Sequence, residues 1–279
     1  MDQEAAYTLL EEHLALGALL DEGTDGRLAP LRYNGVDEKA AFSEGVALVD
    51  LTCMGSQLVS GDDTSAFISA LFAGEELAIG QCAPQVALTG DGSLSSLVLL
   101  ARTGQEEFAW WDLVGRDAIM SCWADFVISI EQGGIQPFGE VELEDASEAL
   151  VPILLWGPQA GVVLSDYLGD QDLPAPGTIA NRMLDKINCL VAVPAFDDQP
   201  CYLVLVPPAR ARVLWRSFLS FNEVSPVGLE AFRQQVQTCF DVLGNISGTF
   251  GCVTPSREQL LSAGLLRADG SFIGARGLS

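Results

Sequence analysis

The sequence is poor in basic side chains. It has two lysines, Lys39 and Lys186, among 14 lysines and arginines, against 38 aspartates and glutamates, so the formal net charge is -24. Such a negative field repels nucleic-acid phosphates and anionic lipid headgroups. We therefore expect neither nucleic acid nor membrane among the partners. A general solubility effect, a basic docking partner or adaptation to salt would each account for the acidity.

Histidine and paired cysteines are also scarce. His13 is the single histidine, and the seven cysteines include no Cys-x-x-Cys pair. The sequence therefore offers no set of ligands with the spacing of a zinc site. The odd number of cysteines argues against a complete disulfide framework and favours buried thiols in a reducing compartment. A Ser–His–Asp triad would have to use His13, which lies in a leucine-rich segment and is more simply explained as structural.

Long apolar runs and nucleotide-binding loops are missing as well. The longest apolar run, residues 149–156, contains Pro152 and falls short of the roughly 20 residues that a membrane helix needs. The N-terminus is acidic and lacks the basic region of a secretory signal, so we expect a cytoplasmic protein. Neither a Gly-x-x-x-x-Gly-Lys loop nor a Gly-x-Gly-x-x-Gly motif after a strand is present. The sequence therefore does not indicate a nucleotide-binding fold of either type.

What the sequence does have is a repeated alternation of strand and helix patterns. Apolar residues make up 49% of the chain, enough for one large or two moderate domains. After a helix expected over residues 5–20, two stretches beginning near Gln57 and Ile153 follow one plan: strand, glycine, helix, strands joined by tight turns, and a second helix. We predict an internally duplicated α+β fold, with helices on one face of mostly antiparallel sheets.

A recognisable motif runs from Leu48 to Gly61. Leu-Val-Asp-Leu-Thr-Cys-Met-Gly leads to Val-Ser-Gly-Asp-Asp. This order resembles the Leu-Phe-Asp-Val-Ser-His-Met-Gly and Val-x-Gly-x-Asp motifs of the folate-binding T-protein (aminomethyltransferase) family of the glycine cleavage system. Cys53 stands where the family usually has histidine. Further segments match the family in order, namely residues 12–18, 31–38, 156–160, 226–233, 254–255 and 270–276.

The resemblance implies domains arranged around a folate pocket. We expect residues 1–50 and 144–279 to form a first, discontinuous domain and residues 51–143 to form a second. In the family a small β-barrel domain follows the stretch that matches residues 270–276. Because the sequence stops at Ser279, we expect that barrel to be absent, with part of the substrate-ordering wall lost or supplied by a partner.

The resemblance also implies a function. Tetrahydrofolate is the expected cofactor, and the reaction is transfer of an aminomethyl or methyl unit, with a lipoyl- or one-carbon-carrier protein as a further partner. Tyr33 and Met54 match positions that often line the folate cavity, although core packing explains both equally well. Asp112 replaces the asparagine that ends the family's Val-Val-Asn strand and is taken as a cofactor-binding candidate.

Two further cofactor-binding candidates come from the second half of the chain. Asp198 and Gln199 lie where the family has a Gly-Glu pair whose glutamate contacts the pterin, so a carboxylate is available after a small shift. Asp198 is otherwise typical of an exposed turn. The arginine that often contacts the glutamyl tail of folate aligns with Phe232 or Arg233, depending on a single gap.

The departures from the family fall on the chemistry. A Gly-Gly-x-x-Asp-Asp hairpin supplies its carboxylate, whereas this chain has Gly-Ser-Leu-Ser-Ser over residues 92–96. A serine hydroxyl cannot act as a base near neutral pH without help. Asp91 and Ser96 are the catalytic candidates, although Asp91 also suits an Asp-Gly turn, and Ser96→Asp should raise a weakened activity. The alternatives are a non-catalytic folate-binding protein and a protein-interaction module that has lost its ligand.

Overall fold

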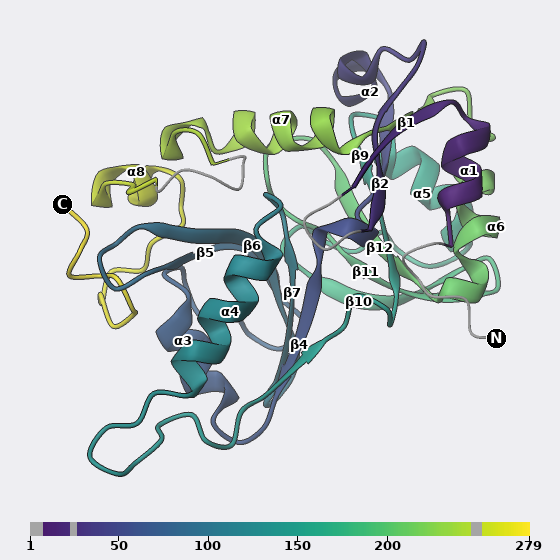
Figure 1. Cartoon of the computed structure of the whole chain (residues 1–279). Coiled ribbons are helices and arrows are strands. Elements are labelled where there is room, and N and C mark those ends of the chain that lie inside the picture. Colours follow the sequence, from purple (N-terminus) through teal and green to yellow (C-terminus); the bar gives the residue numbers. More distant parts are fainter. Residues whose placement is uncertain (1–7, 23–26, 247–252) are drawn as a thin grey trace. The chain divides into compact units, whose positions relative to one another are not determined.

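The chain forms two compact units, each assembled from two separate stretches of sequence. The computed structural model describes residues 8–22, 27–246 and 253–279 (Figure 1). One unit comprises Met1–Cys53 and Ala146–Gln235, and the other comprises Met54–Asp145 and Val236–Ser279. This differs from the expected division in one respect. The last part of the chain, expected in the first domain, packs in the second unit, where Arg267 donates hydrogen bonds to backbone carbonyls of residues 69–74.

The first unit is built on a six-stranded sheet with the order β10-β11-β12-β9-β3-β13. Its strands are β3 (Val46–Asp50), β9 (Val151–Trp156), β10 (Ile179–Leu184), β11 (Ile187–Ala192), β12 (Cys201–Val206) and β13 (Val224–Val227). Neighbouring strands are antiparallel, except that β13 runs parallel to β3. Helices α5 (Ala160–Leu168) and α6 (Pro208–Phe218) supply the apolar side chains that complete its core, among them Leu164 and Trp215.

The N-terminal segment departs from the expected helix. Of the described residues, Leu10–Ala15 form α1, and Gly17 then adopts a φ of +75° that few other residues tolerate. The leucines that follow belong to β1 (Ala18–Glu22), which pairs with β2 (Leu28–Tyr33). The start of the expected helix, residues 5–7, lies outside the described residues. Helices α2 (Glu38–Glu44) and α7 (Leu229–Cys239) follow β2 and β13.

The second unit has a five-stranded antiparallel sheet with the order β5-β6-β7-β4-β8. Its strands are β4 (Ser56–Ser60), β5 (Cys82–Leu88), β6 (Leu94–Gly104), β7 (Glu107–Asp112) and β8 (Glu142–Asp145). Helices α3 (Thr64–Leu71) and α4 (Asp117–Ile128) pack on this sheet (Figure 1). Phe67 and Met120 from these helices meet Val98 and Trp110 from the strands in one core. The remaining elements are the short helices η2 (Thr52–Met54), η3 (Asp241–Leu243) and α8 (Arg257–Ser262).

The two sheets confirm the expected duplication. Along the chain, β4-α3-β5-β6-β7-α4 in one unit corresponds to β9-α5-β10-β11-β12-α6 in the other. In each case three consecutive strands form a meander, and the last of them pairs antiparallel with the first strand of the repeat. The fold is therefore α+β with mostly antiparallel sheets. Among the described helices, none is long and apolar enough to span a bilayer.

Candidate functional site

Two neighbouring serines at the start of β6 have different surroundings. Ser96 is fully buried, and its hydroxyl donates a hydrogen bond of 2.5 Å to Oδ1 of Asp112 on β7. Ser95 is also buried, but its hydroxyl has no hydrogen-bond partner among the described residues. In the pairing of β6 with β5, Ser96 lies opposite Ala87 and Leu94 lies opposite Leu88, so Ser95 is the extra residue of a bulge. Such bulges re-aim side chains and are frequent beside active sites.

Both carboxylate oxygens of Asp112 accept hydrogen bonds. Its Oδ2 accepts hydrogen bonds from the backbone N–H groups of Val114 (3.2 Å), Gly115 and Arg116 (2.8 Å), which immediately precede α4. Burial raises the pKa of Asp112 to about 6, although the hydrogen bonds from Ser96 and the backbone act in the opposite direction. These contacts hold the start of α4 against the end of β7. They give Asp112 a structural role within its own unit.

Asp91 lies in the exposed turn between β5 and β6. Its Oδ1 accepts hydrogen bonds from the Thr89 hydroxyl (2.6 Å) and from the Ser93 backbone N–H (3.1 Å). The bond from Thr89 is the main reason that the pKa of Asp91 is lowered. This is the geometry of an aspartate that stabilises its own turn. The catalytic role of Asp91 stays a prediction.

A buried polar network joins α1, β2 and β3 in the first unit. His13 Nε2 lies 2.8 Å from Asp50 Oδ2, and His13 Nδ1 lies 2.7 Å from the Tyr33 hydroxyl. The other oxygen of Asp50 accepts hydrogen bonds from the backbone N–H (2.9 Å) and the hydroxyl of Thr52. The ring of His13 also meets Trp215 edge-on, with centroids 5.1 Å apart. Both ring nitrogens of His13 are thus engaged by neighbours in the first unit, and its structural role stays a prediction.

The protonation of this network follows from its burial. Burial, with the nearby carboxylate of Asp50, raises the pKa of Tyr33, which keeps its hydroxyl protonated and able to donate to His13 Nδ1. Burial alone would raise the pKa of Asp50, but the hydrogen bonds from His13 and Thr52 leave it below its ordinary value. The hydroxyl of Tyr33, a predicted folate contact, is therefore already engaged.

The remaining cofactor-binding candidates have simpler surroundings. Asp198 is exposed between β11 and β12, whereas the side-chain oxygen of the adjacent Gln199 is buried without a hydrogen-bond partner among the described residues. Arg233 is half-buried on α7, next to the fully buried Phe232. Met54 is buried at the end of η2. Burial fits both its predicted role and simple core packing.

The predicted residues divide between the two units. The first unit contains Tyr33, Asp198 and Arg233. The second contains Met54, Asp91, Ser96 and Asp112. Of these residues, Ser96 and Asp112 are brought into direct contact. Sequence reasoning missed Asp50, which lies in the quoted motif. It placed Ser95 and Gln199 in segments that match the family, but it could not show that their oxygens lack partners among the described residues. Within the described part of the chain, no cluster of His, Cys, Asp or Glu could hold a metal ion.

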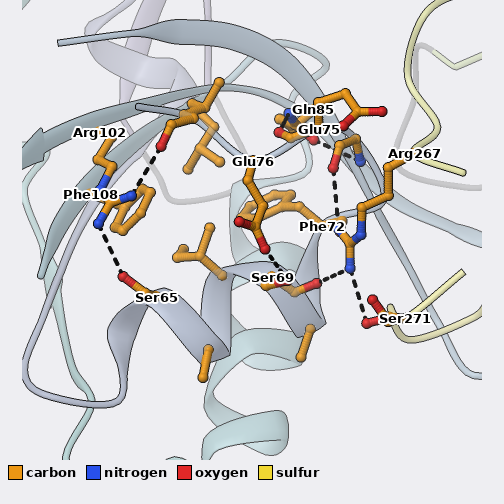
Figure 2. Close-up of a pocket in the computed structure, with 16 residues that line it drawn as sticks. Ser65, Ser69, Phe72, Glu75, Glu76, Gln85, Arg102, Phe108, Arg267 and Ser271 are labelled. Carbon is orange, nitrogen blue, oxygen red and sulfur yellow. Dashed lines mark hydrogen bonds between the residues drawn. The ribbon is translucent and has the colours of Figure 1, made fainter. Parts of the chain in front are cut away.

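A pocket of about 410 Å³ in the second unit is lined by α3, the segment after it, and the C-terminal stretch (Figure 2). Arg267 closes one side, donating hydrogen bonds to the backbone oxygens of Ser69, Phe72 (2.6 Å), Gly74 (3.2 Å) and Ser271 (3.0 Å). Its guanidinium is buried and is engaged in joining the C-terminal stretch to the end of α3.

On another side of the pocket lies Arg102, above the ring of Phe108 (Figure 2). Its guanidinium donates to the backbone oxygens of Leu77 (3.1 Å) and Gln105 (2.6 Å). Two carboxylates, Glu75 and Glu76, complete the lining. Because both guanidinium groups are turned to backbone oxygens and the other charges are negative, this pocket is poorly suited to an anionic ligand.

A wider hollow of about 820 Å³ lies in the first unit, between residues 32–39 and the start of α7. Glu38 in its wall accepts hydrogen bonds from the backbone N–H groups of Tyr33 (2.6 Å) and Gly228 (3.3 Å). Burial raises the pKa of Glu38. The carboxylate thereby ties β2 to the link between β13 and α7.

The sequence matches a known family model and several characterised proteins. The model described as the GCVT N-terminal domain matches residues 9–238. An aminomethyltransferase of Thermus thermophilus is 32% identical over 168 residues, 59% of this chain and 45% of the relative. An aminomethyltransferase of Chlorobium limicola is 25% identical over 242 residues, 83% of this chain and 63% of the relative. The chain thus spans about half to two thirds of the length of these relatives.

The fold is similar to that of a solved structure. The crystal structure of the glycine cleavage system aminomethyltransferase T from Bartonella henselae superposes with a TM-score of 0.70. The match covers 97% of this chain and 72% of that one, at 19% sequence identity. At this identity the likeness establishes the fold alone.

Proposed function

The chain belongs to the GCVT N-terminal domain family, and from this premise we propose that it binds tetrahydrofolate and takes part in transfer of a one-carbon unit. The unit is an aminomethyl or methyl group, and a lipoyl- or one-carbon-carrier protein is the expected donor. Aminomethyltransferases are the relatives that support this assignment. Because the chain spans only part of their length, the activity is argued from residues of this chain.

The observation that carries the proposal is an unsatisfied polar atom in the hairpin of the second unit, and the first unit contains a similar one. The Ser95 hydroxyl and the Gln199 side-chain oxygen are buried without a hydrogen-bond partner among the described residues. Buried polar groups in folded proteins are nearly always paired, so each atom needs a reason. Ser95 lies in the hairpin, and Gln199 in the segment, that the resemblance assigns to folate. A pterin ring, which has both N–H donors and nitrogen acceptors, would satisfy the Ser95 hydroxyl.

The other residues have supporting parts in this proposal. Tetrahydrofolate, when bound, supplies the nitrogen that receives the one-carbon unit. Ser95 binds and orients the pterin, with its position fixed by the bulge in β6. The Ser96–Asp112 hydrogen bond holds β6 to β7 beside it. Tyr33 is buried and is held in place by His13 within the first unit.

A second candidate function is folate binding without catalysis. It is favoured by the state of the two carboxylates nearest the hairpin. Asp112 is fully buried with both oxygens bonded, and Asp91 is engaged in its own turn. Neither is free to assist a reacting nitrogen in this conformation. Binding and turnover must therefore be measured separately.

Calorimetric titration with tetrahydrofolate and 5-formyltetrahydrofolate, under anaerobic conditions, tests the binding step. We expect micromolar dissociation constants, about -8 kcal/mol. Ser95→Ala should weaken binding by about 5- to 20-fold, the cost of one buried hydrogen bond. Ser165→Ala is the matched control, because the Ser165 hydroxyl bonds its own helix at Gly161. Absence of binding by the unaltered protein, or equal affinity in all variants, would overturn the proposal.

Turnover is followed by mass spectrometry of the folate after incubation with an aminomethyl-loaded carrier protein. A one-carbon-substituted folate, formed at a rate proportional to protein concentration, supports the transferase. Tight folate binding without any substituted product would assign the non-catalytic role instead.

A further inference from the structure

Helix α4 presents a second apolar face in addition to the one it buries. Met120, Ala124 and Val127 pack into the core of the second unit. Ile119 and Phe126, however, expose 44% and 56% of their surface. Together with Cys122 and Trp123 they recur at i, i+3, i+4 and i+7, which is the spacing of one continuous helical face. We call these four residues the α4 stripe.

The α4 stripe is an ordered surface. The rings of Trp123 and Phe126 stack with centroids 5.5 Å apart and an interplanar angle of 22°. Trp123 also packs against the core, so this pair is anchored to the fold. Aromatic and aliphatic side chains grouped on one exposed face are typical of interaction sites, whereas single exposed apolar residues are ordinary.

Two carboxylates lie beside the α4 stripe. Asp125 borders it on the same helix and Glu131 follows the helix, and no described residue forms an ion pair with either side chain. Between Met54 and Asp145 the sequence has only two basic side chains and no lysine. Both are engaged elsewhere, because Arg102 donates to backbone oxygens and Arg116 is buried and donates to the Leu94 oxygen.

The negative charge beside the α4 stripe decides which kind of partner can bind it. An anionic membrane would be repelled by these carboxylates. A second copy of this chain would bring the same carboxylates, and each copy has a net charge of -24, so self-association is opposed. A positively charged segment with its own apolar stripe satisfies both features, because its leucine-like side chains meet the stripe while its cations meet the acidic border.

We propose that the α4 stripe docks a basic amphipathic helix of a partner protein. Apolar anchors on the partner pack against Ile119, Trp123 and Phe126, and lysines or arginines face Asp125 and Glu131. This inference is independent of folate binding.

The probe is a synthetic amphipathic peptide of leucine and lysine, with leucines at i, i+3, i+4 and i+7, and its affinity for the full chain is measured by fluorescence anisotropy. A matched peptide carries glutamate in place of lysine. The double variant Ile119→Ser/Phe126→Ser should weaken binding of the basic peptide by about tenfold or more. Asp125→Asn/Glu131→Gln should weaken it by about threefold and flatten its salt dependence. Val213→Ser, at an exposed apolar residue of α6 between Arg212 and Leu214, is the control.

All variants replace exposed side chains, and an unchanged thermal midpoint will show that each one folds. Binding of the lysine peptide that falls in both α4 double variants and not in the Val213 variant supports the proposal. Equal binding of the glutamate peptide, absence of binding, or affinity unaffected by either α4 variant overturns it. A dimer that sediments as such and is dissociated by Phe126→Ser would also overturn it, by making a second copy the occupant.

Discussion

Ser95 and Ser96 are adjacent in the sequence, but their hydroxyl groups have different hydrogen-bonding environments. The family resemblance pointed to Ser96, since the family has two aspartates in this hairpin. In the structure the hydroxyl of Ser96 is bonded to Asp112, and the hydroxyl of Ser95 has no partner among the described residues. A bulge in β6 separates the two environments. Nothing in the sequence marks the bulge. The sequence therefore identifies the hairpin that contains the candidate serine, but it does not tell Ser95 from Ser96.

These environments reverse the expectation for aspartate substitutions. Ser95→Asp should introduce a carboxylate into the hairpin and raise one-carbon transfer by about tenfold or more, while burial of that unpaired charge also lowers stability. Ser96→Asp should instead bury a second carboxylate against Asp112 and destabilise the fold by about 3 kcal/mol. Turnover and urea unfolding of both variants check this. A gain in activity from Ser96→Asp with unchanged stability would contradict it.

Asp112 makes stability depend on pH. Because the folded state holds its proton up to a pKa of about 6, whereas the ordinary value is 3.8, the folded state binds more protons between these values. Its contribution to stability therefore falls as pH rises from about 4 to 6, by up to about 3 kcal/mol, and is constant above. Asp112→Asn keeps an acceptor for the backbone N–H groups and removes the charge.

We expect Asp112→Asn to be more stable than the unaltered protein at pH 7.5, by about 1 to 3 kcal/mol, and to show no gain at pH 4. Urea unfolding at the two pH values measures the difference. Asp125→Asn on the exposed side of α4 serves as control and should change neither value. An equal gain at both pH values would refute the assignment of the effect to the Asp112 proton.

At the scale of elements, strands were easier to predict than the segments that join them. The apolar run of β9 is buried throughout and lies where a strand is expected near Ile153. The leucines after α1 were assigned to a helix because their spacing suits one. Gly17 ends the helix, and Leu19 lies in the β1–β2 ribbon with 43% of its surface exposed. A ribbon held mainly by pairing between its own strands leaves a weak apolar pattern.

Arg267 is the residue that joins the C-terminal stretch to α3. Arg267→Met should leave several buried backbone oxygens unpaired and lower the free energy of unfolding by about 2 to 4 kcal/mol. Amide hydrogen exchange should accelerate at the end of α3 and in residues 264–276. Arg276→Met, at an exposed arginine of the same stretch, is the matched control. Equal effects of the two substitutions would show that the hydrogen bonds of Arg267 contribute nothing specific.

At the scale of the whole molecule, acidity is the dominant property. With a net charge of -24, the folded state experiences self-repulsion that salt screens. Raising sodium chloride from about 0.02 to 0.5 M should raise the thermal midpoint by several degrees, about 1 kcal/mol or more of stability. The rise should shrink near pH 4, where many carboxylates are protonated. A midpoint that is independent of salt at neutral pH would contradict this.

The interleaving of the two units has a consequence for synthesis. Strand β3 is buried along its entire length and lies between β9 and β13. Both of these neighbouring strands are synthesised only after the stretch that ends at Asp145. The other unit in turn waits for Val236–Ser279. A nascent chain therefore carries an unpaired apolar strand until β9 has emerged, which is a state prone to aggregation. We expect this protein to depend on chaperones that hold incomplete chains, and fragments cut at unit boundaries to be insoluble.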